Sequence, residues 1–140
     1  MDVRRVFAML SIAALLGACD SPRSPLEADD LKIAAQQLES IAGEADWLAQ
    51  QLRDGDVTRN MAWLHQQALG EDTVKAMRSV AKPVPPKLRV QHAQVVEAGA
   101  HLEEQVGRIA GAAGRAEELD ALRRDLQAVG RAVAPVARPA

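Results

Sequence analysis

Three histidines and the acidic residues near them are the first candidates for metal chemistry in this chain. His92 and His101 are nine residues apart, which places them on roughly opposite sides of one helix, so they cannot share a metal ion. His65 has no Asp, Glu or His at a helical spacing that would give a preformed site. Glu97, His101 and Glu104 share one helix face, which is typical of a solvated stripe with weak carboxylate–histidine pairing. We therefore expect no metal site.

Haem binding and nucleophilic catalysis need residue sets that this sequence does not supply. The Cys-x-x-Cys-His motif of covalent haem attachment is absent from the sequence. A non-covalent haem would need axial ligands such as Met61 or Met77 with His92, in a pocket with unusually few aromatic residues. No serine after residue 20 lies in a glycine-rich elbow, and the Gly111–Gly114 stretch lacks the Lys-Ser/Thr ending of a phosphate loop. We expect no cofactor and no enzymatic activity.

The only cysteine, Cys19, closes a short apolar run near the start of the chain. Residues 1–5 form a basic head, and residues 6–16 have the length of a signal-peptide core and are too few to cross a bilayer. The sequence Leu16-Gly17-Ala18-Cys19 resembles a bacterial lipobox. The resemblance implies that residues 1–18 are a lipoprotein signal peptide, removed by cleavage before Cys19. It also implies that Cys19 is the site of lipid attachment, so that a membrane lipid is the chain's first partner.

Two further resemblances concern export and sorting. Asp20 resembles the signal that retains lipoproteins in the inner membrane of enteric-type bacteria, which favours that membrane and leaves the outer membrane open. Arg4-Arg5-Val6-Phe7 resembles part of a twin-arginine export signal, although its usual leader is missing and a simple positive head explains the same residues. Residues 19–23 form only a short linker, so the domain is expected on the periplasmic face, close to the membrane.

Composition favours helices and disfavours nucleic acid. Loss of residues 1–18 would leave about 122 residues, enough for one domain with a core. The formal net charge of the chain is −2, which gives no attraction to nucleic acid. The chain has two Trp, no Tyr and a single Phe in the leader, so base-stacking and carbohydrate sites are disfavoured. Alanine and leucine dominate, which is typical of long helices.

Four stretches have the apolar spacing of helices, roughly residues 25–53, 57–81, 86–110 and 115–134. Ser24 is the expected N-cap of the first helix, with Glu27 completing a capping box, and Gly55 is its expected stop. Asp56 or Thr58 would cap the second helix, which we expect to bend near Gly70. The prolines of residues 82–86 form a stiff connector, Gly111–Gly114 a turn, and residues 135–140 a disordered tail.

Apolar stripes along these helices predict the core. The first helix carries its stripe at Leu31, Ala34, Leu38, Ile41, Ala45, Leu48 and Leu52. The second has two stripes, the first at Val57, Met61, Leu64 and Ala68 and the second at Val74, Met77 and Ala81 in phase with Trp63. The third stripe includes Leu88, Val95, Leu102 and Ile109, and the fourth Leu119, Leu122, Leu126, Val129 and Val133.

Short links between helices make neighbours antiparallel, so the sequence predicts an all-α, up-down-up-down four-helix bundle over residues 24–134. The strict heptad spacing of the first and fourth helices is also that of a coiled-coil seam, which leaves a homo-oligomer open.

Trp47 lies away from the main stripe of the first helix. A large aromatic side chain off the core face is a candidate contact for a partner protein. It is equally consistent with a wider buried arc on that helix. Trp63, in phase with Val74 and Met77, is expected in the core.

These features predict a membrane-anchored periplasmic lipoprotein that acts without catalysis, through contact with an unidentified envelope protein. It would be a scaffold, an accessory protein or a protective protein of the envelope. The alternative is a four-helix bundle that binds a small ligand or cofactor.

Overall fold

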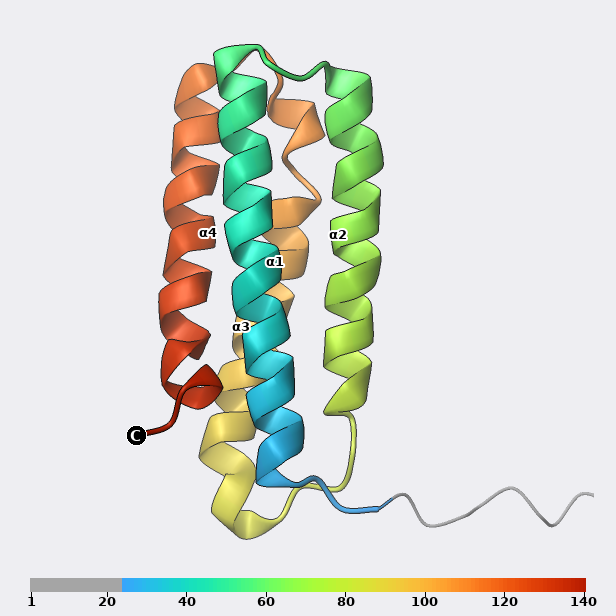
Figure 1. Cartoon of the computed structure of the whole chain (residues 1–140), viewed down its shortest axis with the longest axis vertical. Helices are drawn as coiled ribbons and strands as arrows, with labels where there is room; N and C mark the ends of the chain where they lie inside the picture. The colour runs from blue at the N-terminus through green and yellow to red at the C-terminus, as the bar shows by residue number, and fades with distance from the viewer. Residues whose placement is uncertain (1–23) are drawn as a thin grey trace, which may run out of the picture.

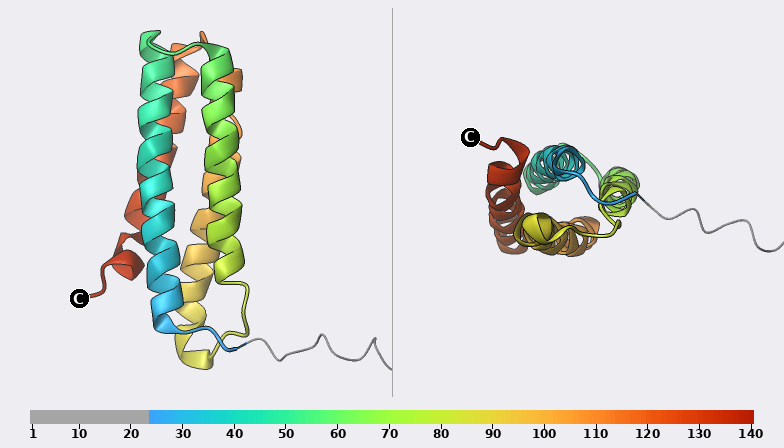
Figure 2. Two further views of the ribbon diagram at one scale, coloured as in Figure 1. Left: turned by 45° about the vertical axis from the view of Figure 1, so that its right-hand side comes forward. Right: turned by 90° about the horizontal axis from the view of Figure 1, so that it is seen from below.

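Four long helices stand side by side and alternate in direction, as the computed structural model shows (Figure 1). The structure describes residues 24–140; the predicted signal peptide, the lipobox with Cys19 and the 19–23 linker lie outside the described residues. The helices are α1 (Ala28–Asp54), α2 (Arg59–Ser79), α3 (Arg89–Val106) and α4 (Ala116–Ala137), with short 3₁₀ turns at Pro86–Leu88 and Ala110–Ala112. Seen from the end, they follow one another around a ring (Figure 2). The predicted all-α four-helix bundle is confirmed.

The start of α1 differs from the sequence prediction. Its N-cap is Glu27 rather than Ser24, and a capping box joins Glu27 to Asp30, whose Oδ2 accepts a hydrogen bond from the Glu27 N–H at 2.9 Å. Residues before Glu27 stay outside the helix because the Leu26 N–H donates to the carbonyl of Pro83 at 2.9 Å and the Leu26 side chain is buried. This tertiary contact outweighs the local capping preference of Ser24.

The turn between α1 and α2 follows the predicted chemistry. Gly55 ends α1 in the left-handed conformation, with φ of 79°, which a residue with a Cβ rarely adopts. Of the two candidate caps for α2, Thr58 has the role, because its Oγ1 accepts a hydrogen bond from the Met61 N–H at 3.2 Å. The helix then continues through Gly70, so the prediction of one helix is confirmed, while the bend near Gly70 stays a prediction.

The C-terminal ends of α3 and α4 also differ from the prediction. The α-helical part of α3 stops at Val106, and Gly114, with φ of 80°, makes the turn into α4. At the other end, α4 continues past the predicted boundary to Ala137, so residues 135–137 belong to the helix. Val136 and Ala137 are buried, and the Ala137 carbonyl accepts a hydrogen bond from Gln36 Nε2 at 3.1 Å. Burial of these residues keeps the tail in place despite Pro135.

The core lies mainly between α1 and α4, the two helices that pack most closely. All the stripe residues predicted for these two helices are buried. Half of the buried residues of α1 are alanines, whose small side chains let a neighbouring helix approach closely. The buried alanines of α1 are Ala34, Ala35, Ala42, Ala45 and Ala49.

The predicted core face of α2 was wrong for three of its large side chains, although Val57 and Met77 do pack against the core. Met61, Trp63 and Leu64 are 58%, 52% and 63% exposed, respectively. The buried face instead consists of Ala62, Gln66, Leu69, Thr73 and Ala76. Two of these residues are polar and bury their polar groups in hydrogen bonds, so an apolar pattern could not identify this face. Gln66 bonds the Gly107 carbonyl and the Ala110 N–H, and Thr73 bonds the Leu69 carbonyl.

Candidate functional site

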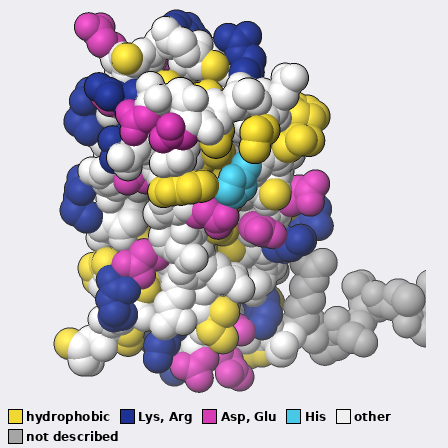
Figure 3. All heavy atoms as spheres, turned by 45° about the horizontal axis from the view of Figure 1, so that its top comes forward, with side chains coloured by type: hydrophobic (Ala, Val, Ile, Leu, Met, Phe, Trp, Pro, Cys, Tyr) yellow, Lys and Arg dark blue, Asp and Glu magenta, His cyan; other side chains and the backbone are white. Residues whose placement is uncertain are grey.

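An exposed apolar surface crosses from α1 to α2, and we call it the α1–α2 patch: Trp47, Met61 and Leu64, with His65 between the helices. Trp47 is 51% exposed. Met61 and Leu64 are three residues apart and therefore share one face of α2. The rings of Trp47 and His65 meet edge to face, with centroids 6.3 Å apart and planes at 63°. Figure 3 shows hydrophobic side chains gathered around a histidine on this side of the molecule.

A contact between His65 of α2 and Glu44 of α1 orders the middle of the patch. His65 Nε2 lies 2.8 Å from Oε1 of Glu44, so the imidazole is held between a carboxylate and the indole of Trp47, both on α1. Side chains that are ordered before binding lose less entropy when a partner covers them. Trp47 therefore presents a large apolar surface at a low cost in lost freedom.

The exposure of Trp47 argues against a wider buried arc on α1, and its contact with a partner stays a prediction. Trp63 was expected in the core and is exposed instead. It lies two residues from Met61, about 200° around the helix, so it faces away from the α1–α2 patch. Met61 and Leu64 were missed as surface residues. The signal that could have identified them lies at Gln66 and Thr73, on another face of α2. These polar residues can be buried when they hydrogen-bond, so that face could have been recognised as the buried one.

The patch lies at the end of the bundle opposite the chain's entry. Trp47 is about 29 Å along α1 from Ala28 at 1.5 Å per residue. The beginning of α1, the α2–α3 link and the C-terminus all lie at the other end (Figure 1).

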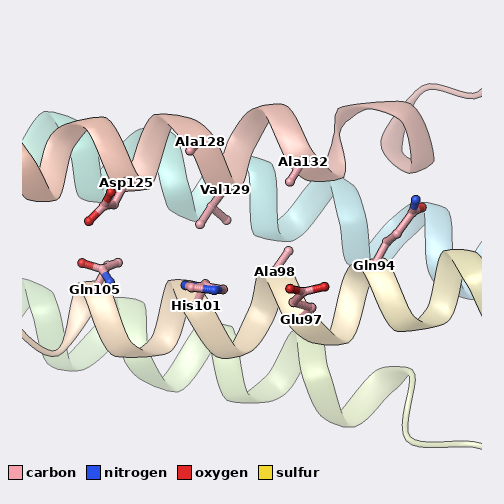
Figure 4. A pocket seen from close by; sticks show the side chains of 9 residues that line it. All are labelled: Gln94, Glu97, Ala98, His101, Gln105, Asp125, Ala128, Val129 and Ala132. Carbon is pink, nitrogen blue, oxygen red and sulfur yellow. The ribbon is translucent and has the colours of Figure 1, made fainter.

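A groove of about 490 Å³ between α3 and α4 is the second feature of the surface (Figure 4). We call it the α3–α4 groove. Glu97 and His101, predicted as part of a solvated stripe, are exposed and line it, whereas Glu104 does not. No pattern in the sequence predicted a groove there. Its remaining lining residues are Gln94, Ala98, Gln105, Asp125, Ala128, Val129 and Ala132.

The candidate metal and haem residues are not brought together. Residues 24–140 contain no group of three or more His, Cys, Asp or Glu side chains that could hold a metal ion. His92 lies beside the end of α2, where its Nε2 is 3.1 Å from the Val80 carbonyl, while Met61 is in the first turn of α2 at the opposite end. Met77 packs against Gly99 of α3, whose missing Cβ leaves room for its sulfur.

Among the described residues, no helix has the length and apolar character needed to span a membrane. Comparisons with protein-family models, with curated proteins and with solved structures found no match for this chain.

Proposed function

We propose that this chain is a bacterial lipoprotein that is anchored to the periplasmic face of a membrane through acylated Cys19. It acts without catalysis, by contact with another envelope protein, as a scaffold, accessory or protective component. The observation that carries the contact function is the α1–α2 patch, where three large apolar side chains are each more than half exposed on adjoining helix faces. Contiguous apolar surface of this kind is typical of protein–protein contacts.

The position of the patch supports this proposal. An anchor at Cys19, followed by the linker of residues 19–23, would hold the start of α1 next to the membrane. The patch would then stand about 29 Å farther out along α1, clear of the lipid surface. A contact surface at the far end of a rod from its anchor can meet a partner in the periplasm or in a neighbouring membrane. Asp20 favours the inner membrane as the site of the anchor.

Position-specific cross-linking in the cell envelope tests the contact function. A photoreactive amino acid replaces Trp47 or Met61 in the full chain, and both positions should give the same discrete adduct. Ala100, an exposed residue of α3 outside the patch and outside the groove lining, is the matched control and should give none. Addition of Leu64→Asp should remove the adduct without unfolding the protein, because Leu64 is 63% exposed.

An adduct of twice the chain's mass would identify the partner as a second copy. Adducts that form equally from Ala100, or that survive Leu64→Asp, would contradict a specific contact at the patch.

A further inference from the structure

The cations of this chain are unevenly distributed, and one run of them lies where the chain enters the bundle. Residues 73–96 contain five Lys or Arg and no Asp or Glu, although the formal net charge of the whole chain is −2. These residues form the end of α2, the α2–α3 link and the beginning of α3. A long segment of one sign in an acidic chain creates a local surface of positive potential. The five cations are Lys75, Arg78, Lys82, Lys87 and Arg89.

Three of the five cations have no carboxylate partner among residues 24–140. The other two, Lys75 and Lys82, have Nζ atoms 3.3 Å and 3.0 Å from carboxylate oxygens. The three unpaired side chains are exposed and belong to Arg78, Lys87 and Arg89. Their charge is therefore available to a partner outside the bundle.

The 3₁₀ turn at Pro86–Leu88 and the first turn of α3 reach farther than the neighbouring helix ends (Figure 1). Lys87 and Arg89 lie on this projection, and Val90 beside them is 70% exposed. An apolar side chain among cations suits a phospholipid surface, where the cations meet phosphate groups and the apolar side chain enters the interface. We call Arg78, Lys87, Arg89 and Val90 the basic tip.

The carboxylates at the start of α1 are largely compensated within the bundle. The Glu27 side chain accepts a backbone hydrogen bond in the capping box of α1, and Asp30 pairs with Lys82. Asp29 lies in the first turn of α1, where the positive end of the helix dipole offsets part of its charge. These groups therefore leave the positive potential of the basic tip in place.

The path of the chain places its first described residues beside the same cations. Ser24, Arg78 and Lys82 line one hollow of the surface. Cys19 is five residues before Ser24, so the two residues are at most about 18 Å apart along an extended chain. An acylated Cys19 would thus hold this end of the bundle close to the lipid headgroups.

We propose that the basic tip rests on the anionic phospholipid headgroups of the membrane that holds the anchor. Arg78, Lys87 and Arg89 pair with lipid phosphates, and Val90 lies at the headgroup boundary. The inference rests on the proposed anchor at Cys19, which supplies proximity. The basic tip adds orientation, because contact at this end directs the α1–α2 patch away from the membrane.

A tryptophan reporter at position 90 tests the proposal. Val90→Trp is made in the full chain with Trp47→Phe and Trp63→Phe, at three positions that are each more than half exposed, so the bundle should fold. The purified chain is inserted through its anchor into vesicles of brominated phosphatidylcholine, with or without about 30% phosphatidylglycerol, an anionic lipid. Bromine quenches the fluorescence of tryptophan that reaches the bilayer. Quenching should be at least about threefold greater with phosphatidylglycerol, and about 1 M salt should remove the difference.

The chain with its two native tryptophans is the control for position. Trp47 lies about 29 Å along α1 from Ala28, and Trp63 lies near the start of α2, at the same far end of the bundle. Neither tryptophan should be quenched in either kind of vesicle.

Three paired substitutions, each added to the reporter chain, locate the charge. Lys87→Gln with Arg89→Gln should reduce quenching to the level seen without phosphatidylglycerol. Lys87→Arg with Arg89→Lys keeps both charges and should retain the quenching. Arg59→Gln with Arg124→Gln removes the same charge from exposed residues outside the basic tip and should change nothing.

Equal quenching in the two kinds of vesicle, or quenching that persists in Lys87→Gln with Arg89→Gln, would overturn the proposal. An acylated chain that is quenched in neither kind of vesicle would also overturn it, and would point to an acidic protein as the occupant of the basic tip. The mass of the purified chain shows separately whether Cys19 is acylated. A chain without acyl groups would overturn the anchor, so failure of the anchor and failure of the basic tip are distinguishable.

Discussion

At the scale of single residues, Cys19 and Trp47 carry the proposed function, one through covalent chemistry and the other through exposed area. The two roles are independent. Replacement of one residue should leave the effect of the other intact.

Replacement of Cys19 by serine should prevent lipidation, because a hydroxyl group does not substitute for the thiol as the acylated group of a lipobox. The variant should remain unprocessed or leave the membrane fraction. Metabolic labelling with a fatty-acid precursor measures this directly. Label that persists in Cys19→Ser would show that the resemblance to a lipobox is misleading.

Replacement of Trp47 by alanine should leave the thermal midpoint nearly unchanged, because the indole is 51% exposed and its removal opens no cavity in the core. The same change should weaken binding to the partner by about 2 kcal/mol or more, roughly 30-fold in Kd, as for other contact hot spots. Calorimetric melting and a binding titration measure the two effects.

In a Trp63→Phe background, emission from Trp47 should be red-shifted and readily quenched. A stability loss of about 3–5 kcal/mol in Trp47→Ala, the cost of removing a buried indole, would instead identify this residue as part of the core.

At the scale of elements, α2 differs from α1 and α4 because its buried face combines apolar residues with the polar Gln66 and Thr73. Gln66 connects α2 to the segment between α3 and α4: its Nε2 donates to the Gly107 carbonyl at 3.2 Å, and its Oε1 accepts from the Ala110 N–H at 2.8 Å. Both ends of a buried carboxamide are thus satisfied, and the segment that links α3 to α4 is fixed against α2.

Gln66→Ala should therefore be costly. It leaves the buried Ala110 N–H without an acceptor and opens a small cavity, for an expected loss of about 2–4 kcal/mol in the free energy of unfolding. Gln67→Ala is the matched control, since the neighbouring side chain is exposed and should change stability by less than about 0.5 kcal/mol. Urea denaturation of both variants measures the difference. Equal stabilities would show that this carboxamide does not hold α2 in place.

The same contrast explains how far the sequence could predict the fold. The cores of α1 and α4 are apolar at every buried position of their stripes, so hydrophobic spacing identified them. The buried face of α2 includes Gln66 and Thr73. Gln66 hydrogen-bonds groups of the segment between α3 and α4 that only the folded chain brings near, whereas Thr73 donates to the Leu69 carbonyl within its own helix. Similarly, Leu26 is drawn out of the first helix by the distant carbonyl of Pro83.

The candidate sites show the same difference between features set within one helix, which the sequence predicts, and features that depend on the placement of two helices. Trp47 stood out in the sequence because it is a large aromatic residue that lies off the apolar stripe of its own helix. Met61 and Leu64 were assigned to the core as a consequence of the error in α2. The groove depends on Ala128 and Ala132 of α4 lying opposite Glu97 and His101 of α3. No local pattern encodes that juxtaposition, because it requires the relative placement of two helices.

At the scale of the whole molecule, the bundle has two distinct ends. The α1–α2 turn and the apolar patch are near one end, and the chain's entry, the α2–α3 link and the C-terminus are at the other (Figure 1). Ion pairs close the entry end. Lys82 Nζ lies 3.0 Å from Asp30 Oδ2, and the guanidinium of Arg138 makes two hydrogen bonds to the Glu39 carboxylate, one of them at 2.6 Å.

These contacts make the entry end sensitive to acid. The backbone hydrogen bond from Glu27 and the ion pair with Lys82 hold the pKa of Asp30 below its ordinary value of 3.8. The hydrogen bonds from Arg138 likewise hold the pKa of Glu39 below 4.5. Because both carboxyl groups are harder to protonate in the folded chain, the unfolded chain binds more protons as the pH falls. Their stabilisation is therefore complete above about pH 5 and is lost as the pH drops through the folded-state pKa values.

In thermal melting between pH 7 and pH 2.5, the melting temperature should accordingly stay nearly constant down to about pH 5 and decrease at lower pH. Hydrogen exchange should increase first at the entry end, in residues 26–39, and later near the α1–α2 turn. Glu39→Gln should lower the midpoint at pH 7 and reduce its dependence on acid, whereas Glu103→Gln, at a carboxylate without an ion pair among residues 24–140, should leave that dependence as it is. Exchange that increases first near the α1–α2 turn would contradict the assignment and would point instead to the ion pair of Arg53 with Asp120 at that end.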